Sequence, residues 1–350
     1  MFTPKFTYTA RIINELTKIE RLYGSLTAKP LIPSLSLKLT EENQILATHF
    51  STSIEGNPLS ERDVTNIILN DKVPTTKSER EVTNYFKVLT QLQAMIRNKE
   101  EISLELTRKL HKTLMTGLID KGLGDYRESG VFVGHTTNFE VVVKHNPPFH
   151  TQKEITAALK DLYTWLMAED DIHPMIKAAI FHHQFAYIHP FYDGNGRLAR
   201  ILTAYYLLMK QYEVTKYFIL DDFYDIDRSL YSDSLHTADK GDKTMWIEYF
   251  LEGIGFSLLG ALSRIEELNR DNMEEVKGIK RVLVTPREED VLEVVINKKA
   301  IKTPDIEDAL DVTRQQAHAL LASLVKKGLL RKFGTTKTSY YRLAKEKEVK

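Results

Sequence analysis

Apolar residues recur at spacings of three and four along most of the chain, which is the pattern of helices that bury one face. Five such stretches are Ile12 to Leu22, Val82 to Ile96, Leu104 to Leu118, Ile155 to Met167 and Met175 to Ile188. The segment from Ser129 to His150 differs, because its valines alternate with other residues around Gly134 to Asn138. The pattern therefore predicts a mainly α fold that carries one β-hairpin.

The C-terminal part of the sequence has a different rhythm. Its expected helices lie near Glu288 to Ile296, from Thr303 and Pro304 onward, and from Thr313 to Gly328. Two short β-prone stretches then flank a turn at Gly334 to Lys337. Three helices followed by a hairpin resemble a winged helix-turn-helix. We expect this domain over residues 286–345, after a polar linker at residues 269–285.

Charge is distributed unevenly along the 350 residues. The chain has 48 Lys and Arg against 48 Asp and Glu, so its formal net charge is zero. Residues 276–350 hold 17 basic and 10 acidic residues, net +7, which leaves 31 basic and 38 acidic residues, net −7, in residues 1–275. The neutral total argues against a dedicated polyanion-binding protein, whereas the basic C-terminal part leaves a local polyanion contact open.

Composition excludes several other classes of protein. A hydrophobic share of 42% is too high for a disordered chain. The lack of cysteine excludes disulfides, thiolate metal sites and cysteine nucleophiles, and we expect a cytoplasmic protein. No stretch reaches the roughly 18–20 apolar residues of a membrane span, and the first residues lack a secretory pattern. We therefore expect no membrane association.

The densest group of polar residues lies between two expected helices. It reads His189-Pro190-Phe191-Tyr192-Asp193-Gly194-Asn195-Gly196-Arg197-Leu198-Ala199-Arg200. Because the second helix is expected to begin near Gly196, its N–H groups and its dipole favour an anion at the loop. Gly194 and Gly196 allow positive φ, which would expose successive N–H groups. Arg197 and Arg200 lie three apart on one helix face, so both guanidinium groups can reach one polyphosphate.

Two more residues of this loop indicate its chemistry. Asp193 would repel phosphate unless a divalent cation lay between them, so Mg²⁺ is implied. His189 is the one side chain of the loop that takes up a proton near neutral pH. The twelve residues resemble the HPFx(D/E)GNGRxxR signature of the Fic family of AMP transferases, with every fixed position present. A polar loop with a helix cap is the alternative. The resemblance covers roughly Leu31 to Phe256.

The resemblance implies a helical Fic fold and transfer of AMP from ATP to a Ser, Thr or Tyr hydroxyl of a target protein. His189 would be the general base that takes the hydroxyl proton, and Asp193 would hold Mg²⁺ on the α- and β-phosphates. The ATP-binding residues would be Gly194, Asn195, Gly196, Arg197 and Arg200. Among these, Asn195 and the loop amides would orient the α-phosphate, Arg197 would hold the β-phosphate and Arg200 the γ-phosphate.

Two further segments are similar to parts of the same family. Gly124-Asp125-Tyr126-Arg127 is similar to its G-x-Y-R segment, and Asn146-Pro147-Pro148 to the proline-rich exit of its hairpin. The hairpin at residues 130–144 would then be the flap that pairs with the target segment, although an ordinary surface hairpin explains its single residues equally well. Tyr231, and more weakly Tyr224, would stack on adenine. Burial in a helical core is the alternative for both tyrosines.

An inhibitory segment is implied upstream, at Ser51-Thr52-Ser53-Ile54-Glu55-Gly56-Asn57. A helix is expected to begin at Thr40 and to stop at Gly56, which leaves Glu55 at a C-terminus, where the dipole disfavours a carboxylate. The segment is similar to the family's (S/T)xxxE(G/N) inhibitory motif. By resemblance, Glu55 pairs with Arg200 in the space that the γ-phosphate needs, and Ser51 faces the site one turn earlier. A solvated glutamate is the alternative.

The expected domain order is an N-terminal helical region at residues 1–75 with its inhibitory helix at about 40–56, a Fic domain at residues 76–268, the linker, and the winged helix. Residues placed where a winged helix contacts DNA are Arg314, Gln315, Gln316, His318, Arg331, Lys332, Lys337 and Arg342. The same fold also serves protein contacts, so both partners stay open.

Three other questions stay open at this point. The same site could remove AMP from its target, or the chain could be a DNA-binding regulator whose Fic domain senses a nucleotide. A homodimer is also left open, because assembly would reinforce or relieve the inhibition. His182 and His183 lack the spacing of a zinc-binding pair, so we expect packing or hydrogen-bonding roles for them.

Overall fold

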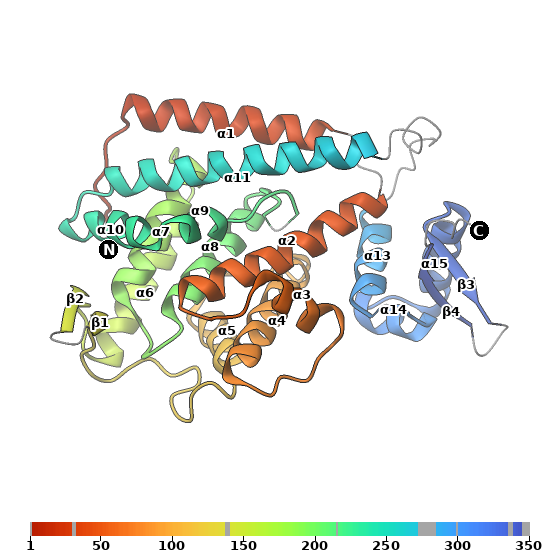
Figure 1. The fold of residues 1–350 in the computed structure, drawn as a ribbon, viewed down its shortest axis with the longest axis horizontal. Helices are drawn as coiled ribbons and strands as arrows, with labels where there is room; N and C mark the ends of the chain where they lie inside the picture. The colour runs from red at the N-terminus through yellow and green to blue at the C-terminus, as the bar shows by residue number, and fades with distance from the viewer. Residues whose placement is uncertain are drawn as a thin grey trace. The chain divides into compact units, whose positions relative to one another are not determined.

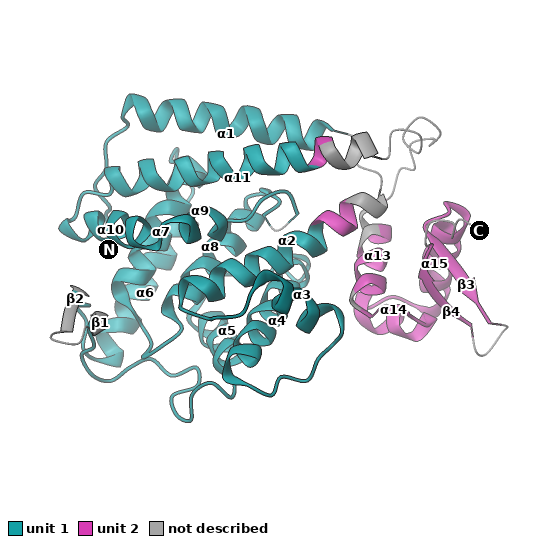
Figure 2. Cartoon of the chain, in the orientation of Figure 1, with its two compact units in different colours: residues 1–29, 40–264 teal, residues 30–39, 265–350 magenta. Residues whose placement is uncertain are grey.

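The computed structural model describes residues 2–29, 33–136, 141–214, 216–271, 285–298, 300–334 and 339–344. The chain forms two compact units (Figure 2). Unit 1 comprises residues 1–29 and 40–264, and unit 2 comprises residues 30–39 and 265–350. The loop at residues 189–200 therefore lies in unit 1.

Unit 1 is built from helices and one pair of strands (Figure 1). Its helices are α1 (Ala10–Ala28), most of α2 (Pro33–Ile54), α3 (Glu61–Leu69), α4 (Lys77–Arg97), α5 (Leu104–Met115), α6 (Gln152–Met167), α7 (Pro174–Ile188), α8 (Asn195–Met209), α9 (Asp221–Ile226), α10 (Arg228–Thr237), the 3-10 helix η1 (Ala238–Lys240) and most of α11 (Thr244–Asp271). The strands β1 (Val133–Thr136) and β2 (Val141–His145) pair antiparallel, with Val133 opposite His145. The mainly α prediction is confirmed.

Hydroxyl side chains cap the N-termini of several of these helices. Thr76 accepts a hydrogen bond from Glu79 N at the start of α4, and the Glu79 carboxylate accepts one from Thr76 N in return. Thr151 and Glu154 make the same reciprocal pair at α6. Because such a capping box satisfies two N–H groups that the helix cannot bond itself, it fixes where each helix begins.

Helices α7 and α8 lie at the centre of unit 1. Nearly every residue of both helices is buried, polar ones such as Thr203 included. A helix that is apolar on all sides belongs in the core of a domain, and α7 has that character. The loop that joins these two helices is therefore anchored at both ends in the most densely packed part of the unit.

Helix α1 runs beside α11 (Figure 1). The hydroxyl of Thr9 donates to Glu248 at 2.6 Å, and Arg11 donates to Glu252 at 2.6 Å. Within the described residues, one helix is long and apolar enough to cross a membrane by length and composition, at residues 244–266 of α11. Its most apolar window is 56% buried, and core helices of soluble proteins pass the same test, so the finding is weak evidence for a span.

Helix α2 begins earlier than the sequence analysis predicts. The expected start was Thr40, because Thr40-Glu41-Glu42 has the form of a cap with an acidic first turn. The observed helix begins at Pro33, where a proline suits the first position, and no residue between Ser34 and Leu39 breaks a helix. The predicted stop is close to the observed end at Ile54, followed by Gly56 with φ of +90°.

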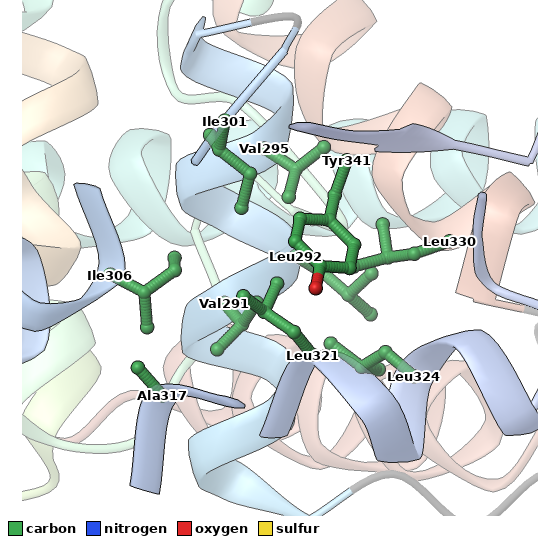
Figure 3. Close-up of a cluster of buried hydrophobic side chains, with 10 residues drawn as sticks. All are labelled: Val291, Leu292, Val295, Ile301, Ile306, Ala317, Leu321, Leu324, Leu330 and Tyr341. Atoms are coloured by element: carbon green, nitrogen blue, oxygen red, sulfur yellow. The ribbon is translucent and has the colours of Figure 1, made fainter. Parts of the chain in front are cut away.

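Unit 2 contains α13 (Pro286–Lys298), α14 (Thr303–Leu310) and α15 (Arg314–Lys326), followed by the antiparallel strands β3 (Leu330–Phe333) and β4 (Tyr340–Leu343). Thr313 caps α15, as predicted. The elements share a buried cluster, shown in Figure 3, of Val291, Leu292, Val295, Ile301, Ile306, Ala317, Leu321, Leu324, Leu330 and Tyr341. Its assignment as a winged helix stays a prediction. Lys337 and most of the expected linker lie outside the described residues, and α11 extends to Asp271, inside the linker's expected range.

Two adjacent leucines of α11 test the core directly. Leu258 is fully buried and Leu259 is 45% exposed. Replacing Leu258 by Ala should lower the free energy of unfolding by about 2–5 kcal/mol, because the change leaves a cavity. Leu259→Ala, the matched control, should cost about 0.5 kcal/mol. Urea unfolding followed by tryptophan fluorescence reports on unit 1, since it holds both Trp165 and Trp246. An equal decrease in the free energy of unfolding in the two variants would contradict this packing.

Candidate active site

The loop between α7 and α8 has a fixed, internally bonded shape. His189 caps α7 in the left-handed region, with φ of 49° and ψ of 63°. The Asn195 side chain closes the loop, since its Oδ1 accepts from Phe191 N at 2.9 Å and its Nδ2 donates to Phe191 O at 2.8 Å. Because both ends of this buried amide are bonded inside the loop, Asn195 fixes the shape of the loop, and one of its two Nδ2 hydrogens is used in doing so.

Two buried side chains outside the loop hold it in place. Arg127 is fully buried and donates to the carbonyl oxygens of His189, at 2.7 Å, and Ile188, at 3.2 Å. His111 accepts from Gly124 N at 3.0 Å through Nδ1, so its Nε2–H donates to the carbonyl of Asp193 at 3.1 Å. Its ring also stacks on Phe191 at 3.7 Å. These contacts hold the backbone of the loop at residues 188, 189 and 193.

The two glycines of the loop have different roles. Gly194 has φ of +79°, as predicted, and a Cβ there would meet Met115 Sδ at 2.7 Å. Gly196 does not have positive φ, so that part of the prediction is wrong: it lies in the first turn of α8. A Cβ on Gly196 would overlap Glu55 Oε1. The missing side chain at Gly196 is therefore what makes room for the Glu55 carboxylate.

Both arginines of the loop are buried and paired with acidic groups. Arg197 forms ion pairs with Glu81 and, at 2.9 Å, with Asp193. Arg200 Nη2 lies 2.8 Å from Glu55 Oε1, and Arg200 Nε lies 3.0 Å from Asp221 Oδ1. Two positive charges with matched carboxylates thus sit at the start of α8, where a helix dipole already favours negative charge.

The last turn of α2 is bound closely to Arg200. Ser51 Oγ accepts from Arg200 Nε at 2.7 Å, and the Ser51 carbonyl accepts from Nη2 at 2.9 Å. Burial on its own would raise the pKa of Glu55, but the charges of Arg200 and then Arg197 outweigh it and hold that pKa below its usual value. The structure thus brings Ser51, Glu55 and Arg200 together, with Glu55 ionised.

His189 has the form that a general base requires. Its Nδ1 lies 3.3 Å from the carbonyl of Ala186, so the proton sits on Nδ1 and Nε2 keeps its lone pair. Burial, acting against a small opposing effect of that carbonyl, lowers the pKa of His189 to about 4. The ring is therefore neutral at pH 7.

The chemistry of Asp193 fits a magnesium ion that arrives with a nucleotide. Its Oδ1 accepts from Gly194 N and from Arg197 Nη2. Its Oδ2 has no hydrogen-bond partner within the described residues, and the side chain is 48% exposed. Mg²⁺ commonly takes one or two carboxylates, with phosphate oxygens and water completing its shell, and one half-exposed carboxylate meets that pattern.

The two candidate base-stacking tyrosines lie in an aromatic core. Tyr224 and Tyr231 stack on each other at 4.3 Å, and their exposed fractions are 1% and 7%. Tyr231 OH lies 2.9 Å from His182 Nε2, and both rings pack near Trp246. Because neither ring presents an open face, a nucleotide base could stack on them only after this cluster opened.

Sequence reasoning missed three residues that shape the site: Glu81, His111 and Asp221. Glu81 and Asp221 are the acidic partners of the two arginines, and burial raises the pKa of Asp221 to about 7. They come from α4 and α9, far from the loop in sequence, and each resembles an ordinary helix-surface acid. His111 lies on the apolar face of a predicted helix, and that position was its one signal.

The protonation of His189 can be measured directly. The burial of the ring predicts a titration midpoint near 4, well below the 6.5 of an ordinary imidazole. Proton NMR of the imidazole resonances between about pH 8 and pH 5 should show the His189 signal unchanged, with the signal assigned by its loss in His189→Gln. A midpoint near 6.5 would contradict the buried, neutral ring.

Comparison with known proteins supplies the family of this region. A model of the Fic/DOC family matches residues 101–207. The protein adenylyltransferase fic-1 of Caenorhabditis elegans is 28% identical over 268 residues, which cover 74% of this chain and 48% of that protein. The protein adenylyltransferase Fic of Culex quinquefasciatus is 27% identical over 255 residues, covering 70% of this chain and 48% of that protein. The chain spans about half the length of these curated relatives.

Solved structures show the same fold. A Fic family protein from Desulfovibrio desulfuricans superposes with a TM-score of 0.64 at 23% identity, covering 99% of this chain and 100% of that one. Fic-1 from Caenorhabditis elegans gives a TM-score of 0.60 at 23% identity, covering 74% of each chain. At these identities the likeness concerns the fold. The signature loop, its packing between α7 and α8 and the family match agree, and residues 101–207 are the region of this chain that matches the Fic/DOC family.

Proposed function

We propose that this chain is a protein adenylyltransferase that moves AMP from ATP to a Ser, Thr or Tyr hydroxyl of a target protein. The observation that carries the proposal is a neutral His189 beside two buried arginines at the N-terminus of α8. The names of the relatives, protein adenylyltransferases, support the same reaction.

The chain's own residues would bind and orient the polyphosphate. Arg197 and Arg200 would exchange carboxylate partners for the β- and γ-phosphates, and the loop amides would face the α-phosphate. Asp193 would hold Mg²⁺, which neutralises phosphate charge when bound. Arg127 and His111 keep these groups in position, and Asn195, which closes the loop on itself, would orient the α-phosphate with its second Nδ2 hydrogen.

His189 would supply the proton transfer. Its Nε2 takes the proton of the target hydroxyl as that oxygen bonds to the α-phosphorus. The bond between the α-phosphorus and the bridging oxygen breaks, and pyrophosphate leaves with the electron pair. The products are the AMP-modified target and pyrophosphate. A neutral imidazole is needed from the start, which the low pKa of His189 supports.

We further propose that Glu55 inhibits this reaction. The carboxylate lies on Arg200 and in the space beside Gly196, where a phosphate would meet the first turn of α8. A carboxylate and a phosphate cannot share that guanidinium group in the same place. ATP would therefore bind either without its γ-phosphate on Arg200 or after the end of α2 moves away.

The target protein would dock on the hairpin of β1 and β2. The pair is two-stranded among the described strands, so a target segment could add to its edge as a further strand. His145, the last residue of β2, donates from Nε2 to the carbonyl of Tyr187, two residues before His189. This contact ties the proposed flap to the helix that carries the base.

Unit 2 is the proposed site of a further contact, with DNA or with protein. The residues of its candidate surface that the structure describes are all exposed, and they are Arg314, Gln315, Gln316, His318, Arg331, Lys332 and Arg342. An exposed basic helix start followed by a basic hairpin supports a polyanion partner. A DNA-binding regulator that senses nucleotide through its Fic domain is therefore the second candidate function, and we propose a cytoplasmic location for either.

Glu55→Gly should activate the protein. If removing the Glu55 carboxylate makes the binding of the γ-phosphate to Arg200 more favourable by about 1.4 kcal/mol, auto-modification with labelled ATP should rise about tenfold. Glu61→Ala, on an exposed residue of α3, is the control and should behave as the wild type. Unchanged labelling in Glu55→Gly would argue against inhibition. Release of AMP from a modified target by the wild type, lost in Glu55→Gly, would instead favour the reverse reaction.

His189→Ala should abolish transfer in the Glu55→Gly background. The loss of a positioned base predicts a rate about 10²–10⁴-fold lower. ATP binding, measured by calorimetry, should stay the same, because the arginines are intact. His318→Ala, on an exposed residue of unit 2, is the control. Transfer that persists in His189→Ala would overturn the assignment of the base.

A further inference from the structure

We propose that His145, His236 and Asp239 form a second metal site, distinct from Asp193, that binds a divalent transition-metal ion of the zinc class. His145 is the last residue of β2, His236 lies near the end of α10, and Asp239 lies in η1. Two ligands thus come from the consecutive elements α10 and η1, and the third comes from the distant strand β2. The proposal concerns the fold beside the active site and stands independently of the reaction proposed above.

The three side chains converge on one point. His145 Nδ1 lies 2.9 Å from Asp239 Oδ2, and His236 Nδ1 lies 3.0 Å from the same oxygen. Their ligand atoms all lie within 4.8 Å of one another. A tetrahedral zinc ion with bonds of about 2.0–2.1 Å separates its ligands by about 3.3 Å. The two distances from Asp239 to the imidazole nitrogens would therefore lengthen by only a few tenths of an ångström to admit the ion.

The hydrogen-bond partners of His145 place two acceptor atoms face to face, and a cation between them would satisfy both. His145 Nε2 lies 2.9 Å from the carbonyl of Tyr187, and a carbonyl can only accept, so Nε2 carries the hydrogen. In the neutral ring Nδ1 is then a lone pair, and it faces a carboxylate oxygen, which is also an acceptor. The His145 side chain is only 4% exposed, so water cannot easily separate them. A cation between the two acceptors removes the conflict, either a metal ion or a second proton on the ring, and the zinc titration below distinguishes the two.

The surrounding contacts are those that metal ligands usually have. A ligating histidine commonly donates its other N–H to a backbone carbonyl, and His145 does so to Tyr187. The second oxygen of Asp239 accepts from His183 Nε2 at 2.8 Å. His183 Nδ1 in turn accepts from Lys243 Nζ at 3.1 Å, which fixes the hydrogen of His183 on Nε2. His183 is therefore a positioning residue for Asp239.

The donor set selects the class of ion. Two imidazole nitrogens and one carboxylate oxygen suit Zn²⁺, whereas Mg²⁺ and Ca²⁺ prefer oxygen ligands throughout. Three protein ligands leave the fourth position to water. A bound ion would tie the end of β2 to α10 and η1, and His145 also reaches α7 just before His189. The site would thus hold one end of the β1–β2 hairpin beside the catalytic loop.

Zinc binding by the full chain tests the proposal. The protein, freed of any affinity tag and stripped with a chelator, is titrated with Zn²⁺ by calorimetry, and Zn²⁺ should bind at one equivalent and raise the melting temperature. Co²⁺ in its place should give the visible absorption of a tetrahedral site. His236→Ala, at a side chain that is 20% exposed, and Asp239→Asn should each weaken binding by about 100-fold or more.

Two control variants make the result specific. His318→Ala lies on an exposed residue of unit 2, and Asp193→Ala removes the carboxylate of the catalytic loop. Both should bind Zn²⁺ as the wild type does. Absence of stoichiometric binding by the wild type would overturn the proposal, as would unchanged binding in a folded His236→Ala. Loss of binding in Asp193→Ala would move the ion to the catalytic loop and overturn it as well.

Discussion

The ion pair between Arg200 and Glu55 is the interaction on which the rest of this account depends. Arg200 is a fully buried cation at the start of a central helix, and such a charge needs a partner in every state of the protein. Ser51, Glu55 and Asp221 supply that partner in this structure. If a phosphate takes the place of Glu55 on Arg200, as proposed above, nucleotide binding and the position of the end of α2 are linked by charge balance.

The hydrogen bonds around the loop at residues 189–200 explain how it keeps its shape beside several charged side chains. Arg127 and His111 bond its backbone, and the Asn195 side chain bonds it to itself. None of these three groups is free to follow a ligand. The loop is therefore preorganised, and in the proposed mechanism the part of the site that moves is Glu55, which reaches the loop from the end of α2.

The sequence predicted the parts of this site that are local, and long-range packing decided the rest. The loop motif and the spacing of Arg197 and Arg200 are short-range features, and the mainly α fold followed from helical periodicity. The residues around Glu81 and Asp221 in the sequence do not indicate a role in the site, because that role comes from packing against a helix distant in sequence. Loop glycines often have positive φ, and this led to the wrong prediction for Gly196. Its actual constraint is the close approach of Glu55, which comes from a distant segment.

The most direct test asks whether Arg200 can hold a γ-phosphate only when Glu55 is gone. Calorimetry compares the affinities of ATP and ADP, both with Mg²⁺, for the wild type, for Glu55→Gly and for Glu55→Gly combined with Arg200→Ala. We predict nearly equal affinities in the wild type, about tenfold tighter ATP binding in Glu55→Gly, and no such preference once Arg200 is removed. The same ATP-to-ADP ratio in the wild type and in Glu55→Gly would contradict the account.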